Sequence, residues 1–165
     1  MAGTRDREGG GGRRGRFGLP MSMANTIRLK IQNSVHRSLL SLTGGRVGKR
    51  VAGMPTLELT TVGRKSGRDH TVVLMAPVVE GDTIVIVGSR AGDAAHPAWF
   101  LNLRETPMTR VSVQHGPERS MVAHVATADE RAALWPRVCE AWKGYDRYQR
   151  RTFREIPLVL LRPVA

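Results

Sequence analysis

The stretch that decides the fold of this 165-residue chain reads Leu59-Thr60-Thr61-Val62-Gly63-Arg64-Lys65-Ser66-Gly67. The β-branched residues in its first half predict a strand, and its glycines predict a tight turn because glycine tolerates positive φ. The Arg fork, the Lys ammonium, the Ser hydroxyl and successive backbone N–H groups of such a turn can face one anion. The motif is therefore typical of a phosphate-bearing ligand site, and equally of a solvated β-hairpin turn.

Beyond residue 56 the pattern is mostly strand. Segments rich in β-branched residues and separated by turns predict six short strands, at 57–62, 71–79, 83–88, 109–114, 120–126 and 158–161. Three helices are expected: at 97–104, from the capping box of Thr127 and Glu130 to about Trp142 with a bend at Pro136, and at 146–154. The arrangement predicts a mainly β fold with some α, a small and largely antiparallel barrel. A Rossmann nucleotide site is not expected, because there is no strand–GxGxxG–helix unit.

The composition restricts the class of protein. The chain is 41% hydrophobic, which suits a single domain with its own core. Its single cysteine, Cys139, excludes an intrachain disulfide and indicates a reducing, cytoplasmic environment. The five histidines lack metal-binding spacings, so we expect no metal site. No apolar run approaches the ~18–20 residues of a membrane span, and no secretory signal is expected.

The positive charge is concentrated near the N-terminus. Residues 1–50 contain 11 Lys/Arg against 2 Asp/Glu, so they carry +9 of the formal net charge of +12. The remainder is only mildly basic and shows no RNP strand, helix–turn–helix or zinc finger. The sequence therefore does not favour nucleic acid as a partner.

Three segments follow from this pattern. We expect a disordered Gly/Arg-rich tail at 1–23, an amphipathic helix and linker at 24–53, and the barrel domain at 54–165. One apolar stripe lies on the expected helix, formed by Ile27, Ile31, Val35, Leu39 and Leu42. This helix either packs on the domain or lies on an anionic membrane surface, which would place the protein at the inner face of the cell membrane.

Four segments, in order, are similar to motifs of one known family. They are the stretch 59–67 quoted above, Val87-Gly88-Ser89-Arg90-Ala91-Gly92, His96-Pro97-Ala98-Trp99-Phe100-Leu101-Asn102-Leu103, and Tyr145-Asp146-Arg147-Tyr148-Gln149-Arg150-Arg151-Thr152-Phe153-Arg154-Glu155-Ile156-Pro157. Together they resemble the deazaflavin-dependent nitroreductase family of actinobacteria, split-barrel proteins that use coenzyme F420. The similarity covers about residues 25–163.

The resemblance implies a cofactor site. In the family the Gly-Arg-Lys-Ser-Gly turn contacts the cofactor phosphodiester, and the next strand passes beside the deazaflavin ring, although Arg is frequent where His70 stands here. The implied cofactor-binding residues are Arg64, Lys65, Ser66, His70, Thr71, Val72, Val73, Leu74, Met75, Val87, Gly88, Ser89, Arg90, Ala98, Trp99, Phe100, Leu101, Asn102 and Tyr145. For Trp99, Phe100 and Leu101 the alternative is simple core packing.

The resemblance also implies an activity. A hydride would pass from reduced F420 to a planar acceptor, quinone-like or nitroaromatic, without a protein nucleophile or metal. The implied acceptor-binding residues are Met75, Trp142, Tyr145 and Tyr148. Tyr145, more than Tyr148, is a candidate proton donor, whereas Trp142 suits a core anchor equally well.

Two other functions remain open at this point. The same barrel type binds FMN, so an FMN-binding split-barrel protein is one alternative. A non-enzymatic F420 carrier or membrane-surface binding protein is the other. The sequence leaves the oligomeric state open.

Overall fold

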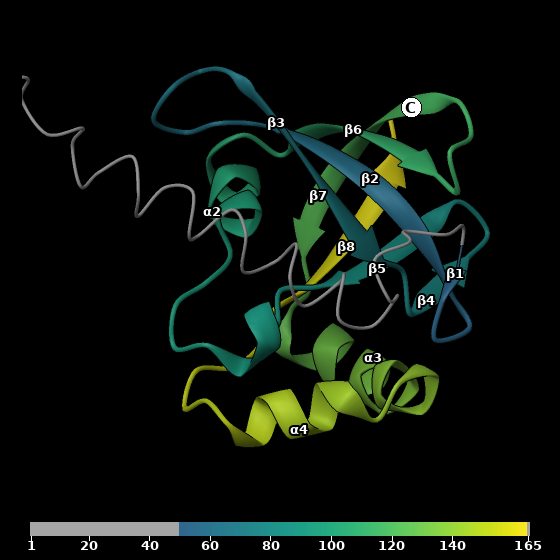
Figure 1. The fold of residues 1–165 in the computed structure, drawn as a ribbon, viewed down its shortest axis with the longest axis vertical. Coiled ribbons are helices and arrows are strands. Elements are labelled where there is room, and N and C mark those ends of the chain that lie inside the picture. Colours follow the sequence, from purple (N-terminus) through teal and green to yellow (C-terminus); the bar gives the residue numbers. More distant parts are fainter. Residues whose placement is uncertain (1–49, 165) are drawn as a thin grey trace, which may run out of the picture.

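The computed structural model describes residues 50–164. The helix expected within 24–53 and the tail before it lie outside these residues. In the described part, an antiparallel sheet curls around an apolar core, with α2 at one side and α3 and α4 packed together below the sheet (Figure 1). The mainly β architecture with short helices that the pattern predicts is confirmed.

Eight strands form one sheet. They are β1 (Arg50–Val51), β2 (Met54–Val62), β3 (Asp69–Met75), β4 (Val78–Glu80), β5 (Thr83–Val87), β6 (Met108–Val113), β7 (Glu118–Val125) and β8 (Leu158–Pro163). Their order is β1-β2-β6-β7-β8-β5-β4, and β3 pairs with β2 beside this path. The helices are the single-turn η1 (Arg90–Gly92), α2 (Ala98–Glu105), α3 (Ala128–Ala141) and α4 (Gly144–Arg150).

Strand β2, which leads into the quoted turn, forms ladders along both of its edges. Leu59 lies opposite Val72 of β3 on one side and Val111 of β6 on the other. The side chain of Leu59 is fully buried, as is that of Val111. The turn that follows β2 is therefore attached to a well-anchored hairpin.

Two apolar clusters stabilise the fold. The first fills the barrel and includes Leu59, Ile86, Trp99, Phe100 and Leu161. The second lies between the sheet and the pair α3/α4, and is formed by buried residues such as Val87, Val138, Tyr145, Ile156 and Leu158. Burial of one large apolar side chain contributes roughly 1.5–3 kcal/mol, so both clusters matter to stability.

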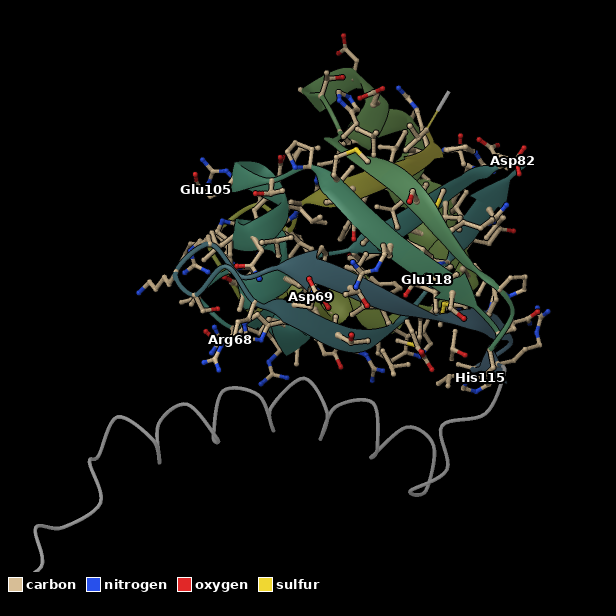
Figure 2. The ribbon with its side chains drawn as sticks, turned by 90° about the horizontal axis from the view of Figure 1, so that it is seen from above. Arg68, Asp69, Asp82, Glu105, His115 and Glu118 are labelled. Atoms are coloured by element: carbon tan, nitrogen blue, oxygen red, sulfur yellow. The ribbon has the colours of Figure 1, made fainter. Side chains whose placement is uncertain are left out.

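Charged side chains link the strands on the outer face of the sheet. The Arg110 guanidinium on β6 lies 2.7 Å from the Asp69 carboxylate on β3 and 2.9 Å from the Glu118 carboxylate on β7. Figure 2 shows Asp69 and Glu118 on this face. Arg110 thus pairs with Glu118 on the neighbouring strand and reaches across β2 to Asp69, and such opposite charges favour the observed register.

The structure differs from the sequence-based expectation in three places. The strand expected at 71–79 is divided into β3 and β4 at Ala76 and Pro77, because proline has no N–H for a ladder and restricts the residue before it. The helix expected at 146–154 begins earlier, at Gly144, and ends at Arg150. The count of six strands is wrong for the described residues, since the short β1 and β4 carry too few residues for a periodic signal.

Candidate active site

The turn between β2 and β3 is closed by its own backbone. The N–H of Gly63 donates to the Arg68 carbonyl at 2.8 Å, and the Gly63 carbonyl accepts from Ser66 at 3.0 Å and Gly67 at 2.7 Å. Gly67 has a φ of 65°, so glycine is needed there for its backbone conformation. Gly63 is needed for space instead: a Cβ at this position would lie 2.6 Å from the His70 ring.

This closure changes what the turn offers to an anion. The N–H groups of Ser66 and Gly67 are used within the turn, so the expectation that they face a ligand is wrong. The side chains of Arg64, Lys65 and Ser66 are exposed. Arg68 points away from the ribbon into solvent at the same end of the molecule (Figure 2). Cationic side chains are therefore the main groups that this turn can offer to an anion.

Asn102 of α2 fixes the start of the turn. Its side-chain carbonyl accepts from the Arg64 N–H at 3.3 Å and from the Arg64 guanidinium at 3.2 Å. Its amide nitrogen donates to the Thr61 hydroxyl at 3.1 Å. Because Asn102 is buried and both polar atoms of its amide have partners, its role in the structure is to hold Arg64.

A pocket opens between this turn, β3 and the start of α2. Its volume is ≈ 240 Å³. Ten of the predicted cofactor-binding residues line it: Arg64, Lys65, Ser66, His70, Thr71, Val72, Arg90, Ala98, Trp99 and Asn102. Cations and hydroxyls thus lie beside an apolar wall, an arrangement that suits a planar ring attached to an anionic group.

Three further pocket residues were not predicted from the sequence. Thr61 and Gly63 lie in the quoted stretch but carry no charge, and Pro97 precedes α2. Gly63 has a detectable signal, because a glycine directly after a strand often marks close approach of neighbouring groups. Thr61 and Pro97 have no such signal of their own, and only their position next to predicted residues could have indicated them.

The other predicted cofactor residues lie outside this pocket's lining. Leu74 and Phe100 are buried in the first core, and Leu101 packs against it. Val73 lies on β3 between Val72, which lines the pocket, and the buried Leu74. Val87 is buried in the second core, and Gly88 approaches Pro157 so closely that a Cβ would lie 2.7 Å from its ring. Packing therefore accounts for most of these residues.

Arg90 forms the far wall of the pocket and comes from a backbone segment of unusual conformation. The φ values are 45° at Arg90, 54° at Ala91 and 79° at Gly92, all left-handed. The Arg90 guanidinium donates to the His96 carbonyl at 3.2 Å and lies 3.5 Å from the Asp93 carboxylate. Its Nε is buried without a hydrogen-bond partner.

The four predicted acceptor-binding residues are brought together, but in a different place. Trp142 packs edge-on against Tyr145 and Tyr148, with ring centroids 5.1 and 5.4 Å away. Met75 packs against the same second core. This aromatic cluster (Trp142, Tyr145 and Tyr148, with Met75 of β3 packed against the same core) lies at the junction of α3 and α4. Helix α4 contacts η1, whose Arg90 lines the pocket.

Tyr145 is the most buried member of the aromatic cluster. Only 3% of the residue is exposed. Burial, and to a smaller degree Tyr148, raises the pKa of the Tyr145 hydroxyl above its ordinary value. The hydroxyl is therefore protonated at neutral pH and is a weaker acid than that of an exposed tyrosine.

Neither a metal cluster nor a spanning helix emerges from this part of the chain. Among residues 50–164 no group of three or more His, Cys, Asp or Glu side chains could hold a metal ion. Over the same residues, no helix has the length and apolar character that crossing a bilayer requires.

Comparison with known proteins shows which family shares this architecture. The model of the F420H(2)-dependent quinone reductase family matches residues 31–163. The F420H(2)-dependent quinone reductase Rv1261c of Mycobacterium tuberculosis is 36% identical over 138 residues, which are 81% of this chain and 88% of that protein. Rv3178 of the same organism is 39% identical over 111 residues, which are 67% of this chain and 91% of that protein.

Solved structures agree with this result. An F420-H2 dependent reductase, FDR-A, has a TM-score of 0.58 and 32% identity over 65% of this chain and 93% of its own. A second structure, described as a domain-swapped dimer, has a TM-score of 0.61 and 30% identity over 85% of this chain and 99% of its own.

The curled antiparallel sheet with its lateral pocket defines a split-barrel oxidoreductase. The chain belongs to the F420H(2)-dependent quinone reductase family. It is therefore a reductase whose cofactor is coenzyme F420, and the predicted fold, cofactor and enzyme class are confirmed.

Proposed function

We propose that the pocket between the β2–β3 turn and α2 holds reduced F420, with Arg64, Lys65 and Ser66 at its phosphate and the apolar wall of Val72, Ala98 and Trp99 along its ring. The observation that carries the proposal is the position of two exposed cations at the rim of an otherwise largely apolar pocket. Charge-assisted hydrogen bonds to such groups contribute roughly 1.5–3 kcal/mol each.

The residues present fit a polyanionic ligand. No acidic side chain lines the pocket, whereas Arg64, Lys65 and Arg90 do. Nε of Arg90 is buried on this wall and forms no hydrogen bond, although the carboxylate of its ion-pair partner Asp93 lies 3.5 Å away, and a buried donor without a hydrogen bond is costly. A negatively charged group near Arg90 would lower that cost.

The bound cofactor supplies the hydride from its ring carbon, so the protein's part is to bind, orient and exclude water. Asn102 fixes Arg64 and thereby the position of the phosphate turn. Val72 and Trp99 present a rigid apolar wall on which a planar ring can lie. We propose that Tyr145 holds the proton that the reduced acceptor takes up, with Tyr148 beside it.

A quinone is the acceptor that we favour for this protein. The aromatic cluster offers the rings of Trp142 and Tyr148, which are only partly buried and can stack on a planar apolar acceptor. A nitroaromatic compound is planar as well, and we propose it as a second acceptor class.

The decisive experiment is a titration of the protein with F420 and, separately, with FMN, followed by an F420H2 oxidation screen. We expect F420 to bind more tightly than FMN, and a panel of soluble quinones to be reduced. Binding of F420 without oxidation by any quinone or nitroaromatic would contradict the proposed reaction and favour a carrier. Tighter binding of FMN would contradict the proposed pocket occupant.

Two finer points concern assembly and location. We propose that the apolar stripe expected at 27–42 lets the protein contact the membrane surface peripherally, where lipid-soluble quinones are found. We also propose that this chain forms dimers, as the domain-swapped relative does. Size-exclusion chromatography with light scattering tests the second point, and a monomer at all concentrations would contradict it.

A further inference from the structure

One guanidinium brackets the left-handed segment at the pocket wall. Arg154, in the loop between α4 and β8, donates from Nη2 to the carbonyls of Gly88 at 3.1 Å and Ser89 at 2.8 Å. Its Nε donates to the Asp93 carbonyl at 2.8 Å. These acceptors lie immediately before and after Arg90–Gly92, so a single side chain holds both ends of η1.

The bracketed segment would not adopt this conformation by itself. Arg90 and Ala91 are non-glycine residues with φ values of 45° and 54°, which local sterics disfavour. Such conformations persist only where surrounding contacts fix them. Arg154 supplies some of those contacts by donating to backbone carbonyls on both sides of the segment. Gly92 supplies another, because it packs against α4 so closely that a Cβ there would lie 2.7 Å from the Tyr148 carbonyl.

Arg154 is itself held by contacts with α3 and α4. The Gln149 side chain donates to the Arg154 carbonyl at 2.9 Å and accepts from the Ile156 N–H at 2.9 Å. Arg131 of α3 donates to that same Gln149 carbonyl at 3.0 Å. A continuous series of hydrogen bonds thus joins α3 to the pocket wall.

We infer that Arg154 is a positioning residue for the cofactor pocket: it holds the Gly88–Asp93 backbone so that Arg90 faces the bound anion. Arg154 does not line the pocket, so it acts through Arg90 rather than by touching the ligand. This inference rests on the proposed function for its ligand, but the loop geometry stands independently of it.

Two substitutions and a control separate positioning from charge. Arg154→Met removes the guanidinium and keeps much of the chain length, whereas Arg154→Lys keeps the charge but cannot span both ends of η1. Arg150→Met is the matched control, because Arg150 is an exposed cation on α4 that pairs with Asp146 of the same helix. Arg90→Met, alone and combined with Arg154→Met, completes a double-mutant cycle.

The first measurement is amide hydrogen exchange of the cofactor-free protein. We expect Arg154→Met to speed exchange at 89–93 while β6 and β7 keep their protection, and Arg150→Met to change neither. If Arg154→Met fails to fold, Arg154→Lys gives the same test with the charge retained. Unchanged exchange at 89–93 in the folded variants would overturn the inference.

The second measurement is the dissociation constant for F420. We expect Arg154→Met to weaken binding about tenfold or more, a loss typical of one charged hydrogen bond. In the Arg90→Met background, Arg154→Met should have less than about a twofold effect. Fully additive effects would show that Arg154 binds the ligand independently and would overturn the positioning role.

The two proposals fail in distinguishable ways. A wild-type protein that does not bind F420 contradicts the proposed function, and the exchange experiment still decides whether Arg154 sets the loop. Equal F420 affinities of the wild type and Arg154→Met would leave the proposed function standing and would contradict the positioning role of Arg154.

Discussion

At the residue scale, Arg64 and Lys65 are the pair on which the proposed cofactor site depends most. We expect Arg64→Ala combined with Lys65→Ala to weaken F420 binding by several kcal/mol, because two charge-assisted contacts of about 1.5–3 kcal/mol each are lost together. Wild-type affinity should also fall as salt rises, since exposed charges are screened. Fluorescence titration measures both effects.

A matched double variant controls for the loss of positive charge. Lys143→Ala with Arg147→Ala removes two exposed cations near α4 that do not line the pocket. That variant should bind F420 nearly as the wild type does. Equal weakening by both double variants would mean that net charge, rather than the turn, attracts the cofactor.

Tyr145 can be tested by removing one atom. Tyr145→Phe keeps the ring in the aromatic cluster and removes the hydroxyl. If Tyr145 is the proton donor, quinone turnover should fall about 10²–10⁴-fold, as is typical for loss of a general acid, while F420 affinity stays unchanged. A fall of less than about threefold would assign Tyr145 to packing alone.

His96 introduces a pH dependence near the pocket. Partial burial, then the charges of Arg154 and Arg104, lower the pKa of His96 below 6.5. Nδ1 of His96 lies 3.3 Å from the Arg154 guanidinium and must accept there, so this geometry requires the neutral ring. A lowered pKa in the folded state means that the unfolded chain binds the proton first.

The sign of the effect follows from that difference. Stability should be constant above the unfolded pKa of about 6.5 and fall as the pH decreases through and below it. His96→Gln should remove this component, so the melting temperatures of variant and wild type should converge or cross toward lower pH. Thermal unfolding at a series of pH values measures the effect. If the melting temperatures of the two proteins differ by the same amount at every pH, the prediction is contradicted.

At the scale of elements, the junction of α3 and α4 depends on a glycine. Gly144 begins α4, and a Cβ there would lie 2.2 Å from the Trp142 ring. Gly144→Ala therefore forces Trp142 out of the aromatic cluster, and we expect it to cost about 1–3 kcal/mol despite the better helix propensity of alanine. Chemical denaturation measures the change.

A second substitution tests the physical reason. In a Trp142→Leu background the clash is absent, so Gly144→Ala should then cost less than about 1 kcal/mol or be favourable. Equal costs in both backgrounds would place the effect in the backbone rather than in the ring.

The elements also show what the sequence can and cannot predict. The strand before Gly63 and the capping box of Thr127 and Glu130 are local signals, and the structure contains both. The split of the strand at Pro77 could have been predicted from proline alone. The two-residue β1 could not, because only its pairing with Met54 and Pro55 makes it a strand.

The same distinction applies to the site. Arg64 and Lys65 were predicted because charge is visible in the turn motif, and Arg90 was implied by the family resemblance. All three line the pocket. Arg154 lies within one of the four motifs, but the partners of its guanidinium lie 58–66 positions away, so nothing local indicates what it does. The turn's N–H groups were misjudged for a related reason, because the sequence does not show which backbone groups are already paired.

At the scale of the whole molecule, the N-terminal region can be tested by truncation. Removing residues 1–20 should leave F420 binding and activity unchanged, because that segment has few apolar residues to dock it. If the stripe at 27–42 binds membranes, removing residues 1–45 should abolish sedimentation with anionic liposomes and leave F420 binding intact. Aggregation or a lower melting temperature of the shorter protein would instead indicate packing on the domain.

The liposome assay needs the full-length protein as its reference. Sedimentation at low salt that weakens at high salt would agree with the basic residues around the stripe, such as Arg28, Lys30 and Arg37. No sedimentation of the full-length protein at any salt would exclude the membrane proposal.

The bracketed segment Gly88–Asp93 lies between the cofactor pocket, which Arg90 lines, and α4, against which Gly92 packs. The cofactor turn stands on the β2–β3 hairpin, whereas the aromatic cluster stands on α3, α4 and the end of β3. Libraries directed at Trp142 and Tyr148 could therefore broaden the range of reducible compounds while the deazaflavin requirement is inherited unchanged. During evolution, substitutions at the same positions would change which acceptor is preferred among proteins that descend from one ancestor.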